Sequence, residues 1–194
     1  MELTEVVGRR RMVRNYAPDP IPRETVERIL RTARKAPSAG FSQGQVFLVV
    51  TNEPGRAEVA RLAGEAERVS RGFDPWLSRA PVHVVVCVDH DAYARRYARP
   101  DKPSGGPATW PVPYAFVDAG ASLMLLLLAA VDEGLAAGLQ GVHNIAGLKE
   151  AFGIPESVDP IGVVTIGRPA PDRRSSSLAA GWKPLEEVVH WEKW

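Results

Sequence analysis

The stretch AGASLMLLLLAAV, residues 119–131, decides which kind of fold this sequence can form. It contains no charged residue, and Asp118 and Asp132 close its two ends. A helical membrane span needs about 20 apolar residues, so this run is too short to cross a bilayer, and we expect no membrane association. It predicts a helix that is apolar on every side and needs cover all round. That cover must come from a sheet of the same chain or from a partner subunit.

On both sides of this helix, short apolar runs predict strands and amphipathic runs predict further helices. The predicted strands are 45–51, 81–90, 135–142 and 160–167. The predicted helices are 2–8, one opened by Pro22, 55–69 and 144–153. Strands and helices therefore alternate loosely, which is typical of an α+β or α/β layered sheet. A chain of 194 residues, which buries roughly 70% of its unfolded surface, is large enough for one such domain.

The charge balance and the cysteine content limit the possible partners and compartments. Lys and Arg total 24 against 23 Asp and Glu, so the net charge is +1, and a nucleic-acid or anionic-membrane surface is not expected. The only cysteine, Cys87, lies in an apolar predicted strand, which favours an inert buried thiol and a reducing, cytoplasmic location. His90 stands between two aspartates, but three adjacent residues cannot all turn onto one ion, and we expect no metal site.

Two arginine-rich stretches stand out near the two ends of the chain. GRRRMVRNY covers residues 8–16, and PAPDRRSSSL covers residues 169–178. Arginine suits phosphate because its planar fork donates two parallel hydrogen bonds and stays charged. If the fold joins these stretches, they hold one phosphate from both sides; otherwise both are solvated surface. The GxGxxG and GxxxxGK[ST] phosphate motifs are missing, so a bound nucleotide must be held in another way.

Two further stretches have features of a ligand site. APSAGFSQGQ, residues 36–45, is rich in small residues that let a planar ligand approach, and Ser38 and Gln43 can hydrogen-bond a heterocycle. The alternative is a plain connector. LQGVHN, residues 139–144, offers backbone N–H groups at a strand end, where Gly141 allows close approach. The sequence has no GxSxG motif and no sign of a Ser/His/Asp triad, so no protein nucleophile is expected.

Four segments, in their order along the chain, point to a known family. They are RRMVRNY at 10–16, DPIP followed by a helix and APSAGFSQGQVF at 36–47, the core helix at 118–135, and the glycine- and proline-bounded strand at 153–170. In this order they resemble the FMN-dependent nitroreductase family. The likeness covers most of the chain, whereas residues 72–113 match little of the family pattern.

The resemblance implies an architecture for the whole chain. It implies an α+β, three-layer sandwich, with a central and mostly antiparallel sheet flanked by helices, which works as an intertwined homodimer. Residues 1–194 then form a single domain, and 168–194 are a C-terminal extension that packs on the partner subunit. Trp182, Trp191 and Trp194 fit such an extension, because exposed indoles are costly in a free tail.

The resemblance also implies two FMN sites at the subunit interface. The residues implied to bind FMN are Arg10, Arg11, Met12, Arg14, Pro37, Ser38, Ala39, Gln43, Gln140, Gly141, Arg173 and Arg174. In this assignment 10–12 and 173–174 hold the phosphate and the ribityl chain, and Arg14 faces the N1/O2 edge. Residues 37–39 come from the other subunit, and the backbone of Gly141 lies near N5. The acceptor pocket is assigned to Phe41, Trp110 and His143, with the proline-rich loop 100–113 as its lid. Taken alone, however, a histidine at the position of His143 is more often a surface residue.

The chemistry implied by the resemblance belongs to the flavin, and no catalytic protein residue is needed. NAD(P)H would deliver hydride to N5 and be replaced by a nitroaromatic, a quinone or a similar small acceptor, in ping-pong order. Two alternatives stay open: the same fold with another flavin or reaction, namely a deazaflavin, flavin cleavage or dehalogenation, or a non-catalytic flavin-binding protein.

Several positions depart from the family pattern. Met12 stands where the usual residue is Ser, and Phe41 stands where it is Asn. Gly44 and Gln45 replace a Pro-Trp pair, and Leu125 stands where many relatives have Asn. Because the arginines remain, FMN binding is expected to survive these changes, while the choice of acceptor depends on them.

Overall fold

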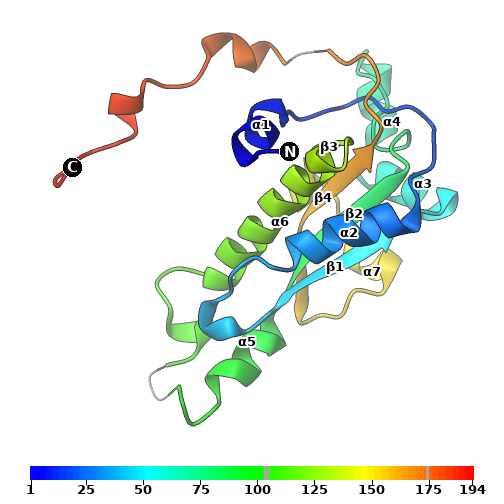
Figure 1. Cartoon of the computed structure of the whole chain (residues 1–194). Helices are drawn as coiled ribbons and strands as arrows, with labels where there is room; N and C mark the ends of the chain where they lie inside the picture. Colours follow the sequence, from blue (N-terminus) through cyan, green and yellow to red (C-terminus); the bar gives the residue numbers. More distant parts are fainter. Residues whose placement is uncertain (103–104, 174) are drawn as a thin grey trace.

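A computed structural model describes residues 1–102, 105–173 and 175–194, apart from the side chain of Asn144. Its centre is a four-stranded antiparallel sheet with the strand order β1-β2-β4-β3 (Figure 1). The strands are β1 Gln45–Val50, β2 Val82–Asp89, β3 Ala136–Gly141 and β4 Val158–Gly167. Each predicted strand is therefore present within two residues of its expected ends.

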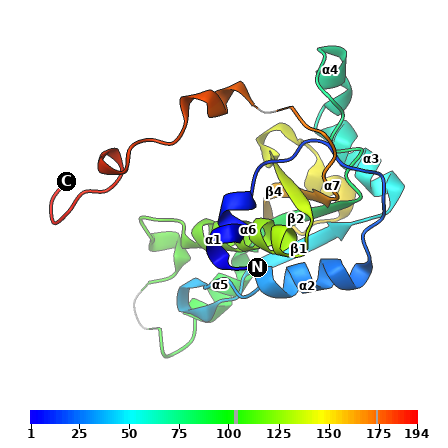
Figure 2. The same cartoon turned by 45° about the horizontal axis from the view of Figure 1, so that its top comes forward.

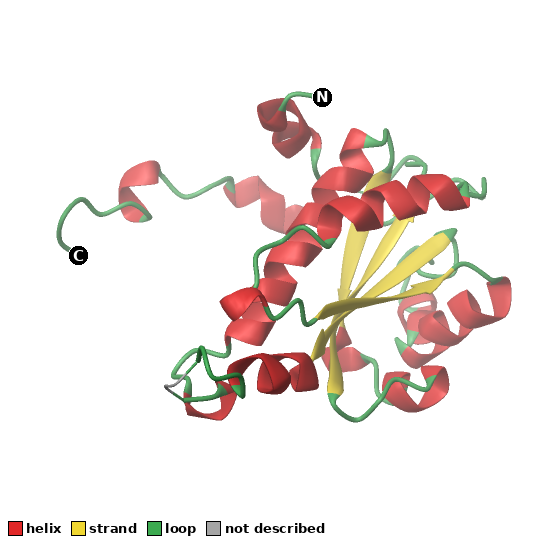
Figure 3. Ribbon diagram, turned by 60° about the horizontal axis from the view of Figure 1, so that its bottom comes forward, coloured by secondary structure: helices red, strands yellow, loops and turns green. Residues whose placement is uncertain are grey.

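Helices cover both faces of this sheet (Figure 3). The α-helices are α1 Leu3–Arg9, α2 Arg23–Ala33, α3 Glu53–Leu62, α4 Glu65–Ser70, α5 His90–Tyr97, α6 Tyr114–Asp132 and α7 Leu148–Phe152. Short 3-10 turns are η1 Ala39–Phe41, η2 Pro107–Thr109, η3 Val142–Asn144, η4 Ser176–Ala180 and η5 Leu185–Glu187. α2 and α6 pack on one face, and α3 and α7 pack on the other. The predicted three-layer α+β sandwich is confirmed.

Strand β2 is apolar at nearly every position because both of its faces are buried. Val84 and Val86 face the layer of α2 and α6, whereas Val85 and Cys87 face the layer of α3 and α7. Successive side chains of a strand point to opposite faces, so a strand between two helical layers needs apolar residues throughout. Burial raises the pKa of the Cys87 thiol to about 12, as expected for an inert core cysteine.

Helix α6 is the helix predicted from residues 119–131. It has 19 residues, and by length and composition alone it is long and apolar enough to cross a membrane. Ala119, Leu126 and Ala130 are nevertheless fully buried in the core formed with α2 and the sheet, which makes it the core helix of this fold. The opposite side of the helix leaves Val117 and Met124 exposed. Within one chain, the expected cover is thus present on one side of α6 only.

Two predicted helices are shorter than expected because glycines interrupt them. The helix predicted at 55–69 is divided into α3 and α4 by Gly64, whose φ of 67° lies in the left-handed region. The helix predicted at 144–153 starts only after Gly147, with a φ of 80°. Helix α5 was not predicted at all.

The C-terminal residues 175–194 leave the body of the molecule (Figures 1 and 2). Trp182, Trp191 and Trp194 are all exposed, Trp182 to 93%. The tail therefore does not bury its tryptophans against its own chain, and its packing on a partner subunit stays a prediction.

Candidate functional site

The first arginine stretch lies along the free edge of β3. Met12 forms a parallel bridge with Ala137, and the Val13 N–H donates to the Ala137 carbonyl at 3.0 Å. Gly138 permits this approach, because a Cβ there would lie 2.4 Å from the Val13 carbonyl oxygen. Helix α1 ends at Arg9, so Arg10 to Arg14 do not lie on a helix. The segment is extended instead, with Val13 buried between the exposed residues 12 and 14.

The second arginine stretch runs beside the first. The Arg14 N–H donates to Asp172 Oδ2 at 2.8 Å, and the Ala170 N–H donates to the Asn15 carbonyl at 3.1 Å. Arg11 also forms an ion pair with Asp172, at 3.9 Å. The two arginine stretches therefore meet, and Asp172, which sequence reasoning did not single out, joins them.

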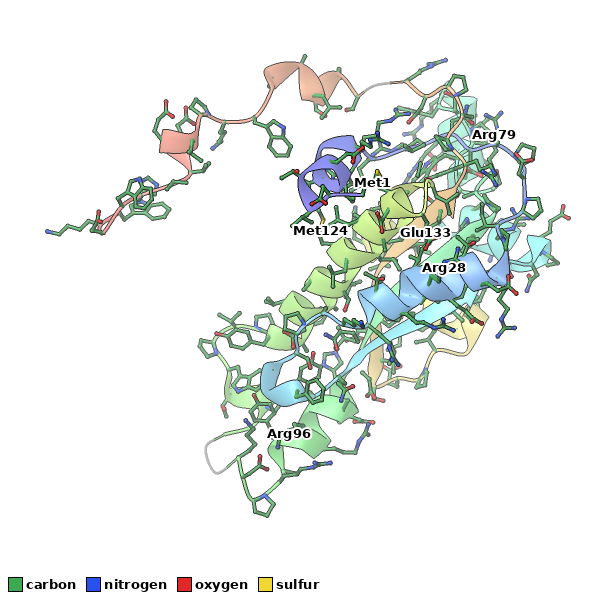
Figure 4. The ribbon with its side chains drawn as sticks, viewed as in Figure 1. Met1, Arg28, Arg79, Arg96, Met124 and Glu133 are labelled. Atoms are coloured by element: carbon green, nitrogen blue, oxygen red, sulfur yellow. The ribbon has the colours of Figure 1, made fainter. Side chains whose placement is uncertain are left out.

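Some arginines near this junction have polar or acidic partners of their own. Arg173 Nε lies 3.6 Å from Asp74 Oδ2, and Arg79 Nη1 donates to Asn15 Oδ1 at 2.9 Å (Figure 4). Arg174, which the sequence assigned to the same cluster, lies outside the described residues. Arg10 and Arg14, in contrast, have no carboxylate within ion-pair distance of their guanidinium groups in the part of the chain that the structure describes.

Helix α4 adds a cation that the sequence analysis missed. Arg68 Nη1 donates to Gln140 Oε1 at 2.9 Å, and Gln140 itself is only 6% exposed. Arg68 also lacks a carboxylate partner among the described residues. It escaped notice because the helix predicted at 55–69 showed only an inward apolar face and no motif. Next to Gln140, a Cβ on Gly141 would lie 2.8 Å from His143 Nδ1, so the His143 ring packs close to this strand end.

The other assigned residues form a second group on the segment 37–43. The Ala39 N–H donates to Asp118 Oδ2 at 2.8 Å, and the Gln43 N–H donates to Ser38 Oγ at 2.9 Å. Phe41 and Gln43 have positive φ values of 58° and 52°, which residues other than glycine rarely adopt. Such backbone strain persists only where surrounding contacts hold it, and it gathers at functional sites.

The two groups lie at opposite ends of α6 (Figures 1 and 2). The segment 37–43 contacts Asp118 near the start of the helix, whereas Met12 contacts Ala137, which follows its end at Asp132. From Asp118 to Asp132 an α-helix rises about 20 Å. Within one chain, the segment 37–43 and the arginine stretch therefore lie far apart along α6.

The comparison with known families decides where this arrangement belongs. Residues 7–168 match the model of the nitroreductase family. The chain belongs to the nitroreductase family. It is 27% identical over 198 residues to a candidate NADH dehydrogenase/NAD(P)H nitroreductase of Methanothermobacter thermautotrophicus, covering 100% of this chain and 88% of the relative. A protein of the same description from Archaeoglobus fulgidus is 28% identical, and the match covers 100% of this chain and 99% of the relative.

Solved structures share the nitroreductase fold. An NADPH:FMN oxidoreductase of Vibrio harveyi, solved in complex with NAD⁺, superimposes with a TM-score of 0.76. The identity is 24%, and the match covers 98% of this chain and 77% of that one. At this level of identity the likeness concerns the fold. The family match and the sequence relatives make this chain an oxidoreductase, and the structural likeness shows its nitroreductase fold.

In this nitroreductase-family chain, the residue assigned to the lid is held by an aromatic cluster. The Trp110 ring lies edge-on to Tyr97, with 4.7 Å between centroids, and also to Tyr93 and Tyr114. The Tyr93 hydroxyl donates to Asp118 Oδ2 at 2.7 Å, and burial raises the pKa of Tyr93. Trp110 is thus fixed between α5 and α6, close to the segment 37–43. Its role at the acceptor pocket stays a prediction.

Proposed function

We propose that this protein is an FMN-dependent NAD(P)H oxidoreductase that reduces nitroaromatic, quinone or similar small acceptors in ping-pong order. One observation carries the proposal. Arg10 and Arg14 belong to the segment that lies beside β3, Arg68 of α4 donates to Gln140 of that strand, and none of the three has a carboxylate partner among the described residues. A cation that no carboxylate of the chain neutralises attracts an anionic ligand. An FMN phosphate and an anionic flavin ring are anions of this kind.

The chemistry of the donors fits the cofactor at each of its parts. Arg10, Arg11 and Met12, with Arg173 and Arg174 of the facing segment, would hold the phosphate and the ribityl chain. Arg14 would face the N1/O2 edge, where a fixed cation stabilises negative charge. Its guanidinium is already held over the Trp76 ring, 5.8 Å from the centroid.

The remaining positions concern the ring and the acceptor. Arg68 would keep Gln140 in place, and the Gly141 N–H would face N5. When bound, FMN supplies the hydride transfer between NAD(P)H and the acceptor. The protein's own part is to bind, orient and exclude water, with Phe41, Trp110 and His143 at the acceptor side.

A homodimer would complete the site. The segment 37–43 of one subunit would approach the β3 edge of its partner, since the two groups are about 20 Å apart along one α6. The exposed side of α6 around Val117 and Met124 and the exposed tryptophans of the tail supply apolar surface for such an interface. The single buried Cys87 supports the cytoplasmic location that we propose with it.

The names of the relatives agree with this proposal. The proteins of Methanothermobacter and Archaeoglobus are described as candidate NADH dehydrogenases/NAD(P)H nitroreductases. The Vibrio harveyi structure is that of an NADPH:FMN oxidoreductase with NAD⁺. These descriptions support FMN as the cofactor and a nicotinamide as the donor.

The test is a visible absorption spectrum of the purified, FMN-loaded protein, repeated after NADPH or NADH is added without oxygen. We expect flavin absorbance that bleaches with a nicotinamide donor and returns when a quinone is added. Arg14→Gln and Arg68→Gln should each lower FMN affinity at least tenfold. Arg61→Gln is the matched control, because Arg61 is an exposed α3 residue paired with Glu58 at 2.6 Å.

Three outcomes would replace the proposal. A protein that takes up no FMN has no flavin site at these arginines. Bound flavin that stays oxidised with both nicotinamides, yet bleaches with dithionite, would indicate the non-catalytic flavin-binding alternative. Preferential uptake of a deazaflavin would indicate the other branch of the fold.

A further inference from the structure

A second cleft, separate from the arginines along β3, opens between the segment 40–43 and helix α5. Its volume is about 450 Å³, which is within the range of small-molecule pockets. The side chains that give it its chemistry are Phe41, Ser42, Gln43, Arg95, Arg96 and Arg99. Asp101 also lines it, so the cleft combines an aromatic ring, two polar side chains, three cations and one carboxylate.

The three arginines of this cleft differ in how they are held. Arg96 donates to both carboxylate oxygens of Asp101, at 2.9 and 2.7 Å, and its Nε donates to the Gly40 carbonyl at 2.6 Å (Figure 4). It acts as a clamp on the strained loop. Arg95 Nη2 lies 3.3 Å from Asp89, whose other carboxylate oxygen accepts from the Ala92 N–H.

Arg99 has no such partner. In the described parts of the chain, no carboxylate lies within ion-pair distance of its guanidinium, although it borders the cleft. The guanidinium group of Arg99 is thus available to a ligand, and that of Arg95 makes only one hydrogen bond within the described residues, to Asp89. Two adjacent guanidinium groups are the usual binding partners of a phosphate monoester, which carries nearly two negative charges at neutral pH.

The aromatic side of the cleft points to the rest of the ligand. Phe41 is 75% exposed and is held at a positive φ of 58°. An exposed phenyl ring on a strained backbone gains nothing within its own chain. A planar base would cover its face, and Gln43, which lines the same cleft, carries an amide that can hydrogen-bond the edge of such a base.

We propose that this cleft binds the adenosine 2′-phosphate end of NADPH and makes NADPH the preferred electron donor. This inference rests on the proposed function. Phe41 stacks on the adenine, and Arg99 with Arg95 holds the 2′-phosphate. NADH carries a hydroxyl at that position and leaves Arg99 unpaired. The nicotinamide end reaches the flavin beside residues 37–39, on the same loop as Phe41.

The kinetic test compares the two donors on the FMN-loaded, full-length protein, by anaerobic bleaching of the flavin. Arg99→Gln should lower kcat/KM for NADPH about tenfold, the effect of losing one charge-assisted contact, and leave the value for NADH within about twofold. Arg61→Gln should change neither. Equal kcat/KM values for NADPH and NADH in the unmodified protein would overturn the inference, and so would an equal loss for both donors in Arg99→Gln.

A binding test keeps the cleft separate from the redox activity. Adenosine 2′,5′-bisphosphate and 5′-AMP differ only in the 2′-phosphate, and calorimetry measures the affinity of each for the FMN-loaded protein. We expect the bisphosphate to bind at least tenfold more tightly, and Arg99→Gln to remove the difference. Equal affinities overturn the inference while the flavin function stands. A difference that depends on Arg99 supports the cleft even if neither nicotinamide bleaches the flavin.

Discussion

His83, in the middle of β2, is a histidine that the fold keeps neutral. It is fully buried, and its Nε2 lies 2.7 Å from the Leu77 carbonyl oxygen. Nε2 must therefore carry the proton, while Nδ1 has no hydrogen-bond partner within the described residues. Burial lowers the pKa of His83 from 6.5 to about 4.

The lowered pKa of His83 makes the folded protein less stable as the pH falls. Between pH 6.5 and about 4 the unfolded chain binds a proton at His83 that the folded chain does not, so the free energy of unfolding falls as the pH falls. The contribution is complete above pH 6.5, and about 3 kcal/mol of it is lost by pH 4. Urea unfolding at pH 7, 5 and 4 measures it. His83→Gln, which can still donate to Leu77, should lack this part of the slope; parallel curves would contradict the prediction.

Gly138 decides at a single position whether the arginine stretch can lie on β3. In Gly138→Ala, the new Cβ would meet the Val13 carbonyl oxygen at 2.4 Å and the Tyr16 hydroxyl at 3.0 Å. The backbone of residues 12–13 must then move away from Ala137. We expect a loss of about 2 kcal/mol in unfolding free energy and at least a tenfold loss of FMN affinity.

Urea unfolding and flavin titration measure these two quantities. Gly8→Ala is the control, because Gly8 lies in α1 with nothing within 4 Å of the place that an added Cβ would take, and alanine favours a helix. A Gly138→Ala protein that binds FMN as tightly as the control would show that the edge of β3 does not position the arginines.

At the scale of elements, α4 organises more of the site than its six residues suggest. Glu65 is buried, and its Oε1 accepts from the N–H groups of Trp76 and Leu77 at 2.7 and 2.6 Å. Trp76 in turn lies beside the Arg14 guanidinium, and Arg68 of the same helix donates to Gln140. One short helix thus connects the arginine stretch with the end of β3.

Removing the Glu65 carboxylate should weaken the connection that α4 makes between the arginine stretch and the end of β3. Glu65→Ala leaves the backbone N–H groups of Trp76, Leu77 and Ser78 without this acceptor, so we expect the unfolding free energy to fall by about 3 kcal/mol and FMN binding to weaken. Glu65→Gln keeps one acceptor oxygen and should lose about 1 kcal/mol. Glu67→Ala, on the exposed side of α4, is the control. A loss in Glu65→Ala no larger than that of Glu67→Ala would contradict this role.

The sequence predicted elements well where the apolar pattern was strong. All the strands and the core helix α6 were found because continuous apolar runs leave few alternatives. Helix α5 was missed because it buries only Tyr93 and has no apolar stripe. The breaks at Gly64 and Gly147 were missed because a glycine inside a helical pattern gives no sign of its φ angle.

At the scale of the whole molecule, the candidate site could be predicted only in part. The residue types at 10–14 and 173–174 indicated an anion site, but the meeting of the two stretches depends on contacts across 158 positions, such as that of Arg14 with Asp172. The contribution of Arg68 could not be predicted either, because it depends on a contact with Gln140 that only the folded chain brings about. The resemblance assigned 37–39 to the other subunit, and the separation of the two groups along α6 agrees with that assignment.

A site shared between two chains makes a prediction that a site within one chain does not. Arg14→Glu damages the β3 half, and Ser38→Trp blocks the half on the segment 37–43. Each variant alone should bind almost no FMN. When the two are unfolded together and refolded, half of the dimers are mixed, and each mixed dimer has one site with both halves intact. FMN binding should therefore return to about one quarter of the unmodified level.

Flavin titration of the refolded mixture measures this recovery. Arg14→Glu refolded with Arg10→Glu is the matched control, since both variants damage the same half and no combination restores it. Recovery in the first mixture and none in the control requires that each site take one half from each subunit. If neither mixture recovers while each variant still folds cooperatively, the two groups do not come from different subunits of one shared site. The exposed side of α6 would then need another explanation than a shared flavin interface.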